Sequence, residues 1–289
     1  QRRSTISNSF ADWWLLRLYQ SEFWVLSKGV TMDVKRLAEP LGAIVSGIDV
    51  REVDRSSFQQ INELFCEYHM LVFPGQVLTP EEQIKFAEYW GDLVAHPYAA
   101  MKDYPTLIEL KNHGKRVDVN QHWHSDMTYN VKPPKLTMLY ALEAPEFGGE
   151  TAFANQILAY KELSEGFKEI IDGLVAFHTA GGLAQIYGEK SEKAPSAEHP
   201  LVRIHDENKQ KGLYACRAFT KKIVGWSGQE SKAMLEFLFE HSVRLEYQAR
   251  HRYRPGDLVM WDNRCLLHYA VHDHGDEPRV LRRLQVVGS

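Results

Sequence analysis

Cysteine is scarce in this chain: Cys66, Cys216 and Cys265 are its three cysteines among 289 residues. They lie far apart, form no CxxC pair and cannot build an even disulfide framework. A disulfide-stapled secreted scaffold is therefore not indicated. We expect three small buried hydrophobic residues in a reducing compartment, and the predicted localisation is cytoplasmic.

Long hydrophobic runs are missing as well. The apolar stretch at residues 13–16 is flanked by Asp12 and Arg17. No stretch reaches the roughly 18 apolar residues of a membrane-spanning helix. The N-terminal region also lacks the apolar core of about 7–15 residues that a secretory signal needs. We therefore expect no membrane partner.

The chain has no excess of positive charge, since 34 Lys and Arg face 38 Asp and Glu for a net charge of −4. Without a basic field, nucleic acid is not an expected partner. Hydrophobic residues make up 44% and charged residues 25%, as in ordinary soluble globular proteins. No repeat and no linker divide the sequence, so residues 32–289 are predicted to form a single domain.

Residues 1–31 differ in pattern from the rest. We interpret them as a poorly ordered extension or as sequence upstream of a true start at Met32, with an amphipathic surface helix as the alternative. A chain that starts at Met32 is then expected to keep full activity.

Short strands dominate the pattern after Met32. Helical spacing predicts helices that begin near Ser56 or Ser57 and at Thr79, and a further helix over residues 156–172. Many short apolar or alternating runs predict a mainly β protein with helices, an α+β class built on a sandwich or barrel. The polar residues 186–196 predict a loop that covers a site.

Two His-x-Asp pairs occur, His124/Asp126 and His274/Asp276. With 13 histidines, about half such a pair is expected by chance, so the pair alone is weak evidence. The second pair lies in a turn-like sequence. In an extended segment, His124 and Asp126 would face the same point, flanked by apolar residues that can exclude water: Trp123, Met127 and Tyr129.

A third ligand would complete the two-His-one-carboxylate triad that holds non-haem Fe(II). His268 is the candidate, because it interrupts an apolar strand far downstream. The alternative is a core histidine that bonds to a backbone carbonyl. Further along, strand alternation places Arg279 and Arg283 on one face and Arg282 on the other. Two inward guanidiniums are costly without anions, which predicts acidic ligands.

Together these segments resemble the taurine dioxygenase / 2,4-dichlorophenoxyacetate dioxygenase family of Fe(II)- and 2-oxoglutarate-dependent enzymes. The resemblance extends from about Met32 to the end of the chain. It is carried by four motifs in order: Trp123-His124-Ser125-Asp126, Gly148-Gly149-Glu150-Thr151, Trp261-Asp262-Asn263-Arg264 with His268, and Arg279 with Arg283.

The resemblance implies a double-stranded β-helix, or jelly-roll, core flanked by helices. It implies that His124, Asp126 and His268 ligate iron, and that Arg279 and Thr151 bind the distal carboxylate of 2-oxoglutarate. O2 would be the second co-substrate, with succinate and CO2 as products. An assembly of identical subunits would also fit the family.

The remaining matches concern a small anionic substrate. His96, Asn120 and Arg283 correspond to substrate-contacting positions of taurine dioxygenase, whereas His122 is left out of the site. The residues after Pro97 depart from the taurine pattern, so the expected substrate stays broad: a sulfonate such as taurine, a sulfate ester, an aryloxyalkanoate or other carboxylate, or a phosphonate. Two alternatives remain, a non-catalytic β-barrel that binds an acidic metabolite and a zinc-dependent hydrolase.

Overall fold

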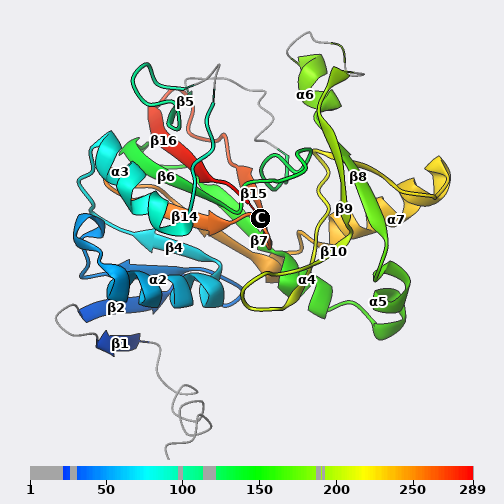
Figure 1. The fold of residues 1–289 in the computed structure, drawn as a ribbon, viewed down its shortest axis with the longest axis horizontal. Coiled ribbons are helices and arrows are strands. Elements are labelled where there is room, and N and C mark those ends of the chain that lie inside the picture. The colour runs from blue at the N-terminus through cyan, green and yellow to red at the C-terminus, as the bar shows by residue number, and fades with distance from the viewer. Residues whose placement is uncertain are drawn as a thin grey trace, which may run out of the picture.

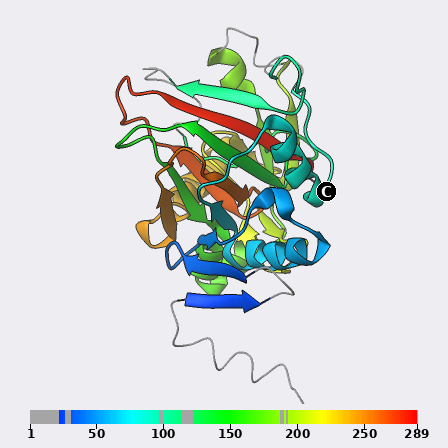
Figure 2. The ribbon, with the colours of Figure 1, turned by 90° about the vertical axis from the view of Figure 1, so that its left-hand side faces the viewer.

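The fold is described from a computed structural model that places residues 22–26, 31–96, 100–112, 122–186, 190 and 193–288. Its largest sheet has eight strands among these residues. In spatial order they are β1 (Glu22–Leu26), β2 (Thr31–Arg36), β3 (Ala43–Ser46), β4 (Met70–Phe73), β14 (Leu258–Asp262), β6 (Leu136–Glu143), β16 (Arg279–Val286) and β5 (Ile108–Asn112). Figure 2 shows these strands stacked from β1 to β5.

Two helices cover the outer face of the large sheet, α2 (Arg55–Tyr68) and α3 (Pro80–Ala87) (Figure 1). The core beneath them is aromatic: the Phe86 ring lies 5.7 Å from the Phe73 ring and 5.2 Å from the Trp90 ring, measured between centroids. Such edge-to-face contacts add to the free energy of apolar burial. This layer fixes the large sheet on one side, so the other side is left to form the site.

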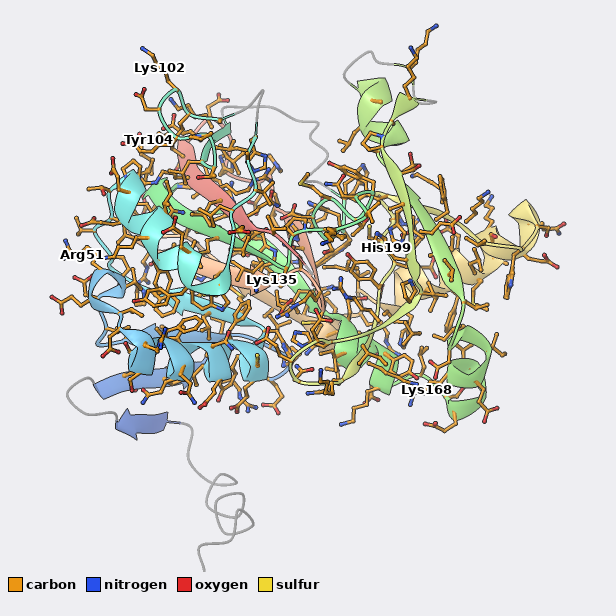
Figure 3. All side chains as sticks on the ribbon, in the orientation of Figure 1. Arg51, Lys102, Tyr104, Lys135, Lys168 and His199 are labelled. Atoms are coloured by element: carbon orange, nitrogen blue, oxygen red, sulfur yellow. The ribbon has the colours of Figure 1, made fainter. Side chains whose placement is uncertain are left out.

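The inner face of the large sheet packs on a three-stranded sheet of order β13 (Gln248–His251), β7 (Thr151–Asn155) and β15 (Leu266–Ala270). Phe153 of β7 meets Trp261 of β14 between the sheets, with ring centroids 5.4 Å apart. Side chains fill the layers between these elements (Figure 3). The two sheets form the jelly-roll core, which confirms the predicted fold class.

A second lobe, residues 156–247, lies beside this core (Figure 1). It holds the sheet β12–β8–β9, the pair β10–β11 and four helices among the described residues. The bounds are α4 (Gln156–Lys161), α5 (Glu165–Ile171), β8 (Val175–Thr179), α6 (Gly181–Ile186), β9 (Ser196–Pro200), β10 (Val202–Ile204), β11 (Lys211–Leu213), β12 (Thr220–Ile223) and α7 (Gly228–His241). Short 3-10 turns at Val50–Glu52, Glu88–Trp90 and Leu245–Tyr247 complete the described elements.

Local capping explains where the helices begin, and it corrects two expectations. Asp54, not Ser56 or Ser57, caps α2, since its carboxylate accepts from the Ser57 backbone N–H at 2.8 Å. The helix expected over 156–172 is two helices, because Ser164 caps α5 and interrupts the run. Thr79 caps α3 as predicted, with Glu82 completing the capping box.

Within residues 1–31, the region interpreted as an extension, the structure places the strand β1. β1 pairs antiparallel with β2 in a register that runs from Glu22 opposite Lys35 to Leu26 opposite Thr31. β1 is therefore the edge strand of the large sheet. The division at Met32 stays a prediction.

Candidate metal and co-substrate site

Backbone pairing brings His124 and His268 together across 144 positions of sequence. The two residues form an isolated antiparallel bridge, with N–O distances of 3.1 Å from His124 to His268 and 2.7 Å in return. Their ring centroids lie 4.1 Å apart. β15 is itself held in place by β7, so the pairing fixes both imidazoles relative to the small sheet.

Asp126 completes a buried cluster with the two histidines, none of them more than 7% exposed. Its Oδ1 lies 3.8 Å from His124 Nε2 and 3.7 Å from His268 Nε2. These distances are too long for hydrogen bonds. They suit donors that share one ion through bonds of about 2.0–2.2 Å, since such donors lie less than about 4.4 Å apart. The donor set fits the two-His-one-carboxylate triad.

Both histidines direct their Nε2 atoms toward the space beside Asp126 Oδ1. His124 Nδ1 donates to the backbone carbonyl of His122 at 2.7 Å, which leaves Nε2 as the acceptor nitrogen. Burial lowers the pKa of His268 to about 3, so its imidazole is neutral at pH 7. A neutral imidazole is the form of histidine that binds a metal ion.

Asp126 is ionised despite its burial. Desolvation opposes the charge, but His268, Arg283, His124 and the Thr137 hydroxyl together hold the pKa of Asp126 well below its usual range. Because His268 is neutral at pH 7, Arg283 is the cation that continues to act there, with Nη1 4.0 Å from Asp126 Oδ1. The cluster therefore presents a carboxylate and not a carboxylic acid.

Arg279 and Thr151 lie side by side, as the co-substrate prediction requires. Arg279 is 4% exposed, and its Nη2 donates to Thr151 Oγ1 at 3.4 Å while its Nε donates to the Gly149 carbonyl at 2.8 Å. Burial lowers the pKa of Arg279. A buried guanidinium next to a hydroxyl suits a carboxylate ligand, because it binds both oxygens of the anion.

The same pair meets a phenol that the sequence did not single out. Tyr253 Oη lies 3.0 Å from Thr151 Oγ1, and the Arg279 guanidinium carbon lies 5.1 Å from the centroid of the Tyr253 ring. The aromatic face favours the cation and the hydroxyl adds a further donor. Tyr253 follows the end of β13, and its local sequence gave no signal of this contact.

Two of the substrate-contact candidates, His96 and Arg283, are placed in the structure, and Arg283 lies close to Asp126. Among the described residues, His96 Nε2 and Arg283 Nε are buried side-chain nitrogens without a hydrogen-bond partner. Burial and the charge of Arg283 lower the pKa of His96, so the two groups are close enough to interact. Asn120 lies outside the described residues. Arg282, on the opposite face of β16, is also buried, where Gln83 of α3 accepts from its Nε at 2.7 Å.

Apolar rings surround the histidines, in part as predicted. Phe219 stands edge-on to His124 with centroids 6.0 Å apart, and Tyr129 stands edge-on to Phe219 at 5.0 Å. Trp123, predicted for this wall, packs instead on Tyr269 at 5.6 Å, on the opposite face of β15 from His268. Phe219 was not singled out, because it lies in a loop far from every motif. A dry wall of this kind protects an oxidising centre from water.

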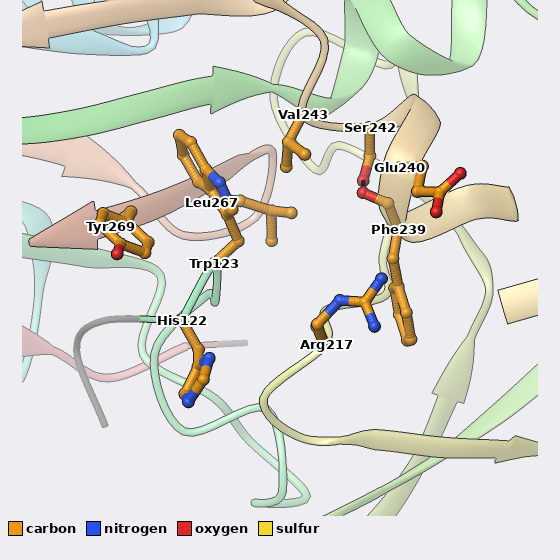
Figure 4. A pocket seen from close by; sticks show the side chains of 9 residues that line it. All are labelled: His122, Trp123, Arg217, Phe239, Glu240, Ser242, Val243, Leu267 and Tyr269. Carbon is orange, nitrogen blue, oxygen red and sulfur yellow. Dashed lines mark hydrogen bonds between the residues drawn. The ribbon is translucent and has the colours of Figure 1, made fainter. Parts of the chain in front are cut away.

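Two cavities adjoin this wall. One of about 550 Å³ is lined by Tyr129, by α6 and by Lys190 and Lys193. The other, about 160 Å³, lies between Trp123, Tyr269 and Phe239, with Arg217 at its rim (Figure 4). Tyr269 flanks His268 in β15, so this smaller cavity lies on the opposite face of the strand from the triad.

The other candidate clusters have structural explanations. His274, of the second His-x-Asp pair, has Nδ1 3.1 Å from the Glu277 carbonyl within a turn. A cluster of His205, Asp262 and Cys265 also has metal-binding side chains. Its Asp262 oxygens are occupied by Arg264, at 2.9 and 2.6 Å, and by His205 at 2.9 Å. That group is an internal ion-pair network.

Comparison with known proteins decides the family. The sequence profile of the family described as "Taurine catabolism dioxygenase TauD, TfdA family" matches residues 33–285. The chain belongs to this family. The resemblance found in the sequence is thereby confirmed, and with it the prediction of an oxidoreductase that depends on 2-oxoglutarate.

Individual relatives act on several anionic compounds. The chain is 35% identical to the alkylsulfatase of Acinetobacter baylyi, over 89% of this chain and 86% of that protein. It is 33% identical to the alpha-ketoglutarate-dependent sulfate ester dioxygenase of Pseudomonas putida, over 89% and 90%. A taurine dioxygenase from Burkholderia xenovorans matches in structure with a TM-score of 0.79 and 31% identity, over 89% and 90%.

A further solved structure bears on the ligands. The structure of AAD-2 in complex with Mn(II) and N-oxalylglycine matches with a TM-score of 0.77 and 28% identity, over 90% of this chain and 98% of that one.

Among the described residues, no helix has the length and apolar character that a membrane-spanning helix needs.

Proposed function

We propose that this family member binds Fe(II) through His124, Asp126 and His268 and oxidises an organic sulfate ester or sulfonate. The observation that carries the metal assignment is the buried cluster, in which two imidazole nitrogens lie 3.7 and 3.8 Å from one ionised carboxylate oxygen. In the proposed reaction, bound iron with 2-oxoglutarate and O2 supplies the oxidising power, releasing succinate and CO2 and placing one oxygen atom in a substrate C–H bond.

The other residues orient the two organic molecules. Arg279 and Thr151, 3.4 Å apart, hold the distal carboxylate of 2-oxoglutarate. Close to Asp126, Arg283 offers an unpartnered Nε–H that would hold the anionic head of the substrate, and His96 adds an unpartnered ring nitrogen. Positioning the reacting carbon between these two anchors supplies much of the rate enhancement, because it removes the entropic cost of alignment.

The walls favour a substrate with an apolar body. Phe219 stands against His124, Tyr129 stands against Phe219, and Tyr129 also lines the cavity of about 550 Å³. An alkyl or aryl chain would gain free energy by packing against apolar rings, whereas a compact polar molecule such as taurine would not. Relatives named alkylsulfatase and sulfate ester dioxygenase support the same choice.

Hydroxylation at the carbon that bears the sulfate oxygen has a defined outcome. The C–H bond becomes C–OH, and the resulting hemiacetal-like sulfate collapses to a carbonyl compound and inorganic sulfate, with the hydroxyl proton lost to solvent. The protein need only hold the sulfate beside Arg283 while the product breaks apart. A hydrolase would release sulfate without consuming 2-oxoglutarate or O2.

A substrate panel tests the proposal. Purified protein with Fe(II), ascorbate, 2-oxoglutarate and O2 is offered alkyl sulfates of increasing length, alkylsulfonates, taurine and aryloxyalkanoates. Succinate and sulfate are expected in equal amounts with medium-length alkyl sulfates. Sulfate without succinate would indicate a hydrolase. No succinate and no Fe(II) uptake, together with binding of anions, would indicate a non-catalytic barrel.

The compartment we propose is the cytoplasm. All three cysteines are free thiols; Cys216 and Cys265 are buried as predicted, whereas Cys66 is partly exposed. Burial raises the pKa of Cys66 to about 12, so this partly exposed thiol is unreactive at neutral pH. The association of identical subunits stays a prediction of the resemblance.

A further inference from the structure

A single hydroxyl sits at the centre of the polar network behind the triad. Thr137 of β6 is fully buried. Its Oγ1 lies 2.6 Å from Asp126 Oδ2, 2.9 Å from Asn263 Nδ2 and 3.2 Å from Gln285 Nε2. Three separate strands or loops thus converge on this oxygen, and one of them carries a proposed metal ligand.

The chemistry of the partners fixes the direction of every bond. Amide nitrogens only donate and a carboxylate only accepts, whereas a hydroxyl has one proton and two lone pairs. The amides of Asn263 and Gln285 occupy both lone pairs, so the Thr137 proton must point at Asp126. Trp261 Nε1, which can only donate, gives its proton to Asn263 Oδ1 at 3.0 Å and thereby fixes how that amide is turned.

This arrangement decides which carboxylate oxygen faces the histidines. A hydroxyl–carboxylate bond of 2.6 Å is a strong, charge-assisted bond that engages Oδ2. Oδ1 is then the oxygen that lies 3.7–3.8 Å from the two imidazole nitrogens. Without Thr137, rotation about the Cβ–Cγ bond could turn either oxygen, or both, toward the ion.

The same network fixes the other two ligands. The backbone carbonyl of Asn263 accepts from the hydroxyl of Ser125, the residue between the two ligands of the His-x-Asp pair, at 2.6 Å. The ring of Trp261 lies 4.8 Å from the ring of His268. The donor chain Trp261 to Asn263 to Thr137 to Asp126 therefore links the strand face behind His268 to the carboxylate.

We propose that Thr137 is a positioning residue that holds Asp126 for ligation of the metal by one oxygen, with Asn263 and Gln285 fixing its polarity. The inference rests on the proposed metal site. It concerns residues that touch neither substrate nor co-substrate. Metal affinity would then depend on the Thr137 side chain of β6 as well as on the geometry of the ligands themselves. A supporting hydroxyl of this kind is typically worth a factor of about 10–100 in metal affinity.

Metal titration of the stripped protein tests this without relying on turnover. Wild type, Thr137→Val and Thr137→Ser are freed of metal with a chelator and titrated with Mn(II) by calorimetry and by electron paramagnetic resonance. Thr137→Val keeps the shape but removes the proton, and we expect its Kd for Mn(II) to rise about 10–100-fold. Thr137→Ser keeps the hydroxyl, and its Kd should stay within about threefold of wild type.

Control variants separate positioning from simple destabilisation. Thr220→Val removes another buried threonine hydroxyl, one that accepts from the Cys216 backbone N–H at 2.9 Å in the second lobe. It should lower Tm but leave the Kd for Mn(II) unchanged. Gln285→Met removes one of the two amides and should raise the Kd less than Thr137→Val does, which provides a second measurement if the valine variant folds poorly.

The outcomes are distinct for the two proposals. If Asp126→Ala binds Mn(II) as tightly as wild type, the metal assignment itself is wrong. If Asp126→Ala loses binding but folded Thr137→Val keeps wild-type affinity and the wild-type resonance spectrum, the metal site stands and the positioning role of Thr137 is overturned. Equal weakening in Thr137→Val and Thr220→Val would also overturn it.

Discussion

Tyr253 places a phenol against both residues proposed to hold the co-substrate. Tyr253→Phe removes the 3.0 Å contact to Thr151 but keeps the ring beneath Arg279. Losing one such bond, worth about 1 kcal/mol, should raise the KM for 2-oxoglutarate about 3–10-fold with kcat nearly unchanged. Succinate formation as a function of 2-oxoglutarate concentration measures both constants.

The double variant provides the control. Because Tyr253 and Thr151 share one hydrogen bond, Tyr253→Phe combined with Thr151→Val should cost less than the sum of the two single changes. A KM that does not move in Tyr253→Phe would show that the phenol only packs against Arg279.

Arg283 offers a second test at the level of one side chain. Its Nη1 lies 4.0 Å from Asp126 Oδ1, and its Nε is buried without a hydrogen-bond partner among the described residues. Arg283→Gln should raise the KM for an anionic substrate at least tenfold, since a charge-assisted bond is lost. Slow succinate formation without substrate should continue, because Arg279 is untouched. If both rates fall together, Arg283 acts mainly through Asp126.

Single residues also show where the sequence was informative. His268 attracted attention because a histidine interrupts an apolar strand, whereas the His124/Asp126 pair was weak evidence alone and became a predicted ligand pair through the family resemblance. Thr137 could not, because threonine is common in strands and only the folded structure reveals that two amides use up its lone pairs. The orientation of an interior hydroxyl depends on partners that are more than a hundred positions away in the chain.

At the level of elements, the turn before β7 sets the position of Arg279. Gly149 has φ +65°, and a Cβ built there would lie 2.9 Å from Pro145 Cγ and 3.1 Å from Arg279 Cδ. Gly149→Ala should therefore strain the turn and displace Arg279. We expect a lower Tm and a KM for 2-oxoglutarate raised about tenfold, on the scale of about 1.4 kcal/mol per tenfold change.

A matched glycine separates strain from displacement. Gly173 has φ +86° and nothing within 4 Å of a built Cβ. Gly173→Ala should lower Tm through backbone strain alone and leave the KM for 2-oxoglutarate unchanged. Equal effects of the two substitutions on KM would contradict a specific role for the Gly149 turn.

The elements themselves were partly predictable. Strands such as β4 and helix α3 follow from local signals, a short apolar run and a Thr-Pro start. Strand order does not, since β14 pairs with β4 on one side and β6 on the other, and neither pairing is visible in local sequence. The resemblance to a known family, and not periodicity, supplied the jelly-roll arrangement.

For the whole molecule, the role of the N-terminal strand is open to a direct test. β1 pairs with β2 at the edge of the large sheet, on the far side of β3, β4 and β14 from β6. A chain that starts at Met32 should keep its kcat and its Mn(II) affinity, because the triad lies on other strands, and should lose a little in Tm. Failure of that chain to fold would contradict the division at Met32.

Buried neutral histidines make the stability of the whole molecule sensitive to acid. Burial lowers the pKa of His69 to about 4, and it lowers the pKa values of His178 and His268 to about 3. Each lies below the value of about 6.5 expected in the unfolded chain. The unfolded state therefore binds more protons below pH 6.5, and the stability that is fully present above this pH is lost as the pH falls toward 3–4.

The expected slope is about 1.4 kcal/mol per pH unit for each of the three histidines in the metal-free protein. Urea unfolding at pH 7.5, 6.5, 5.5 and 5.0 measures it. His178 is not a triad ligand; it lies in β8, where its Nδ1 contacts the hydroxyls of Thr128 and Thr220 at 3.0 and 3.2 Å. His178→Gln can keep a polar contact there but cannot gain a proton. It should therefore reduce the slope by about 1.4 kcal/mol per pH unit, and a slope equal to that of wild type would show that His178 is not neutral in the folded protein.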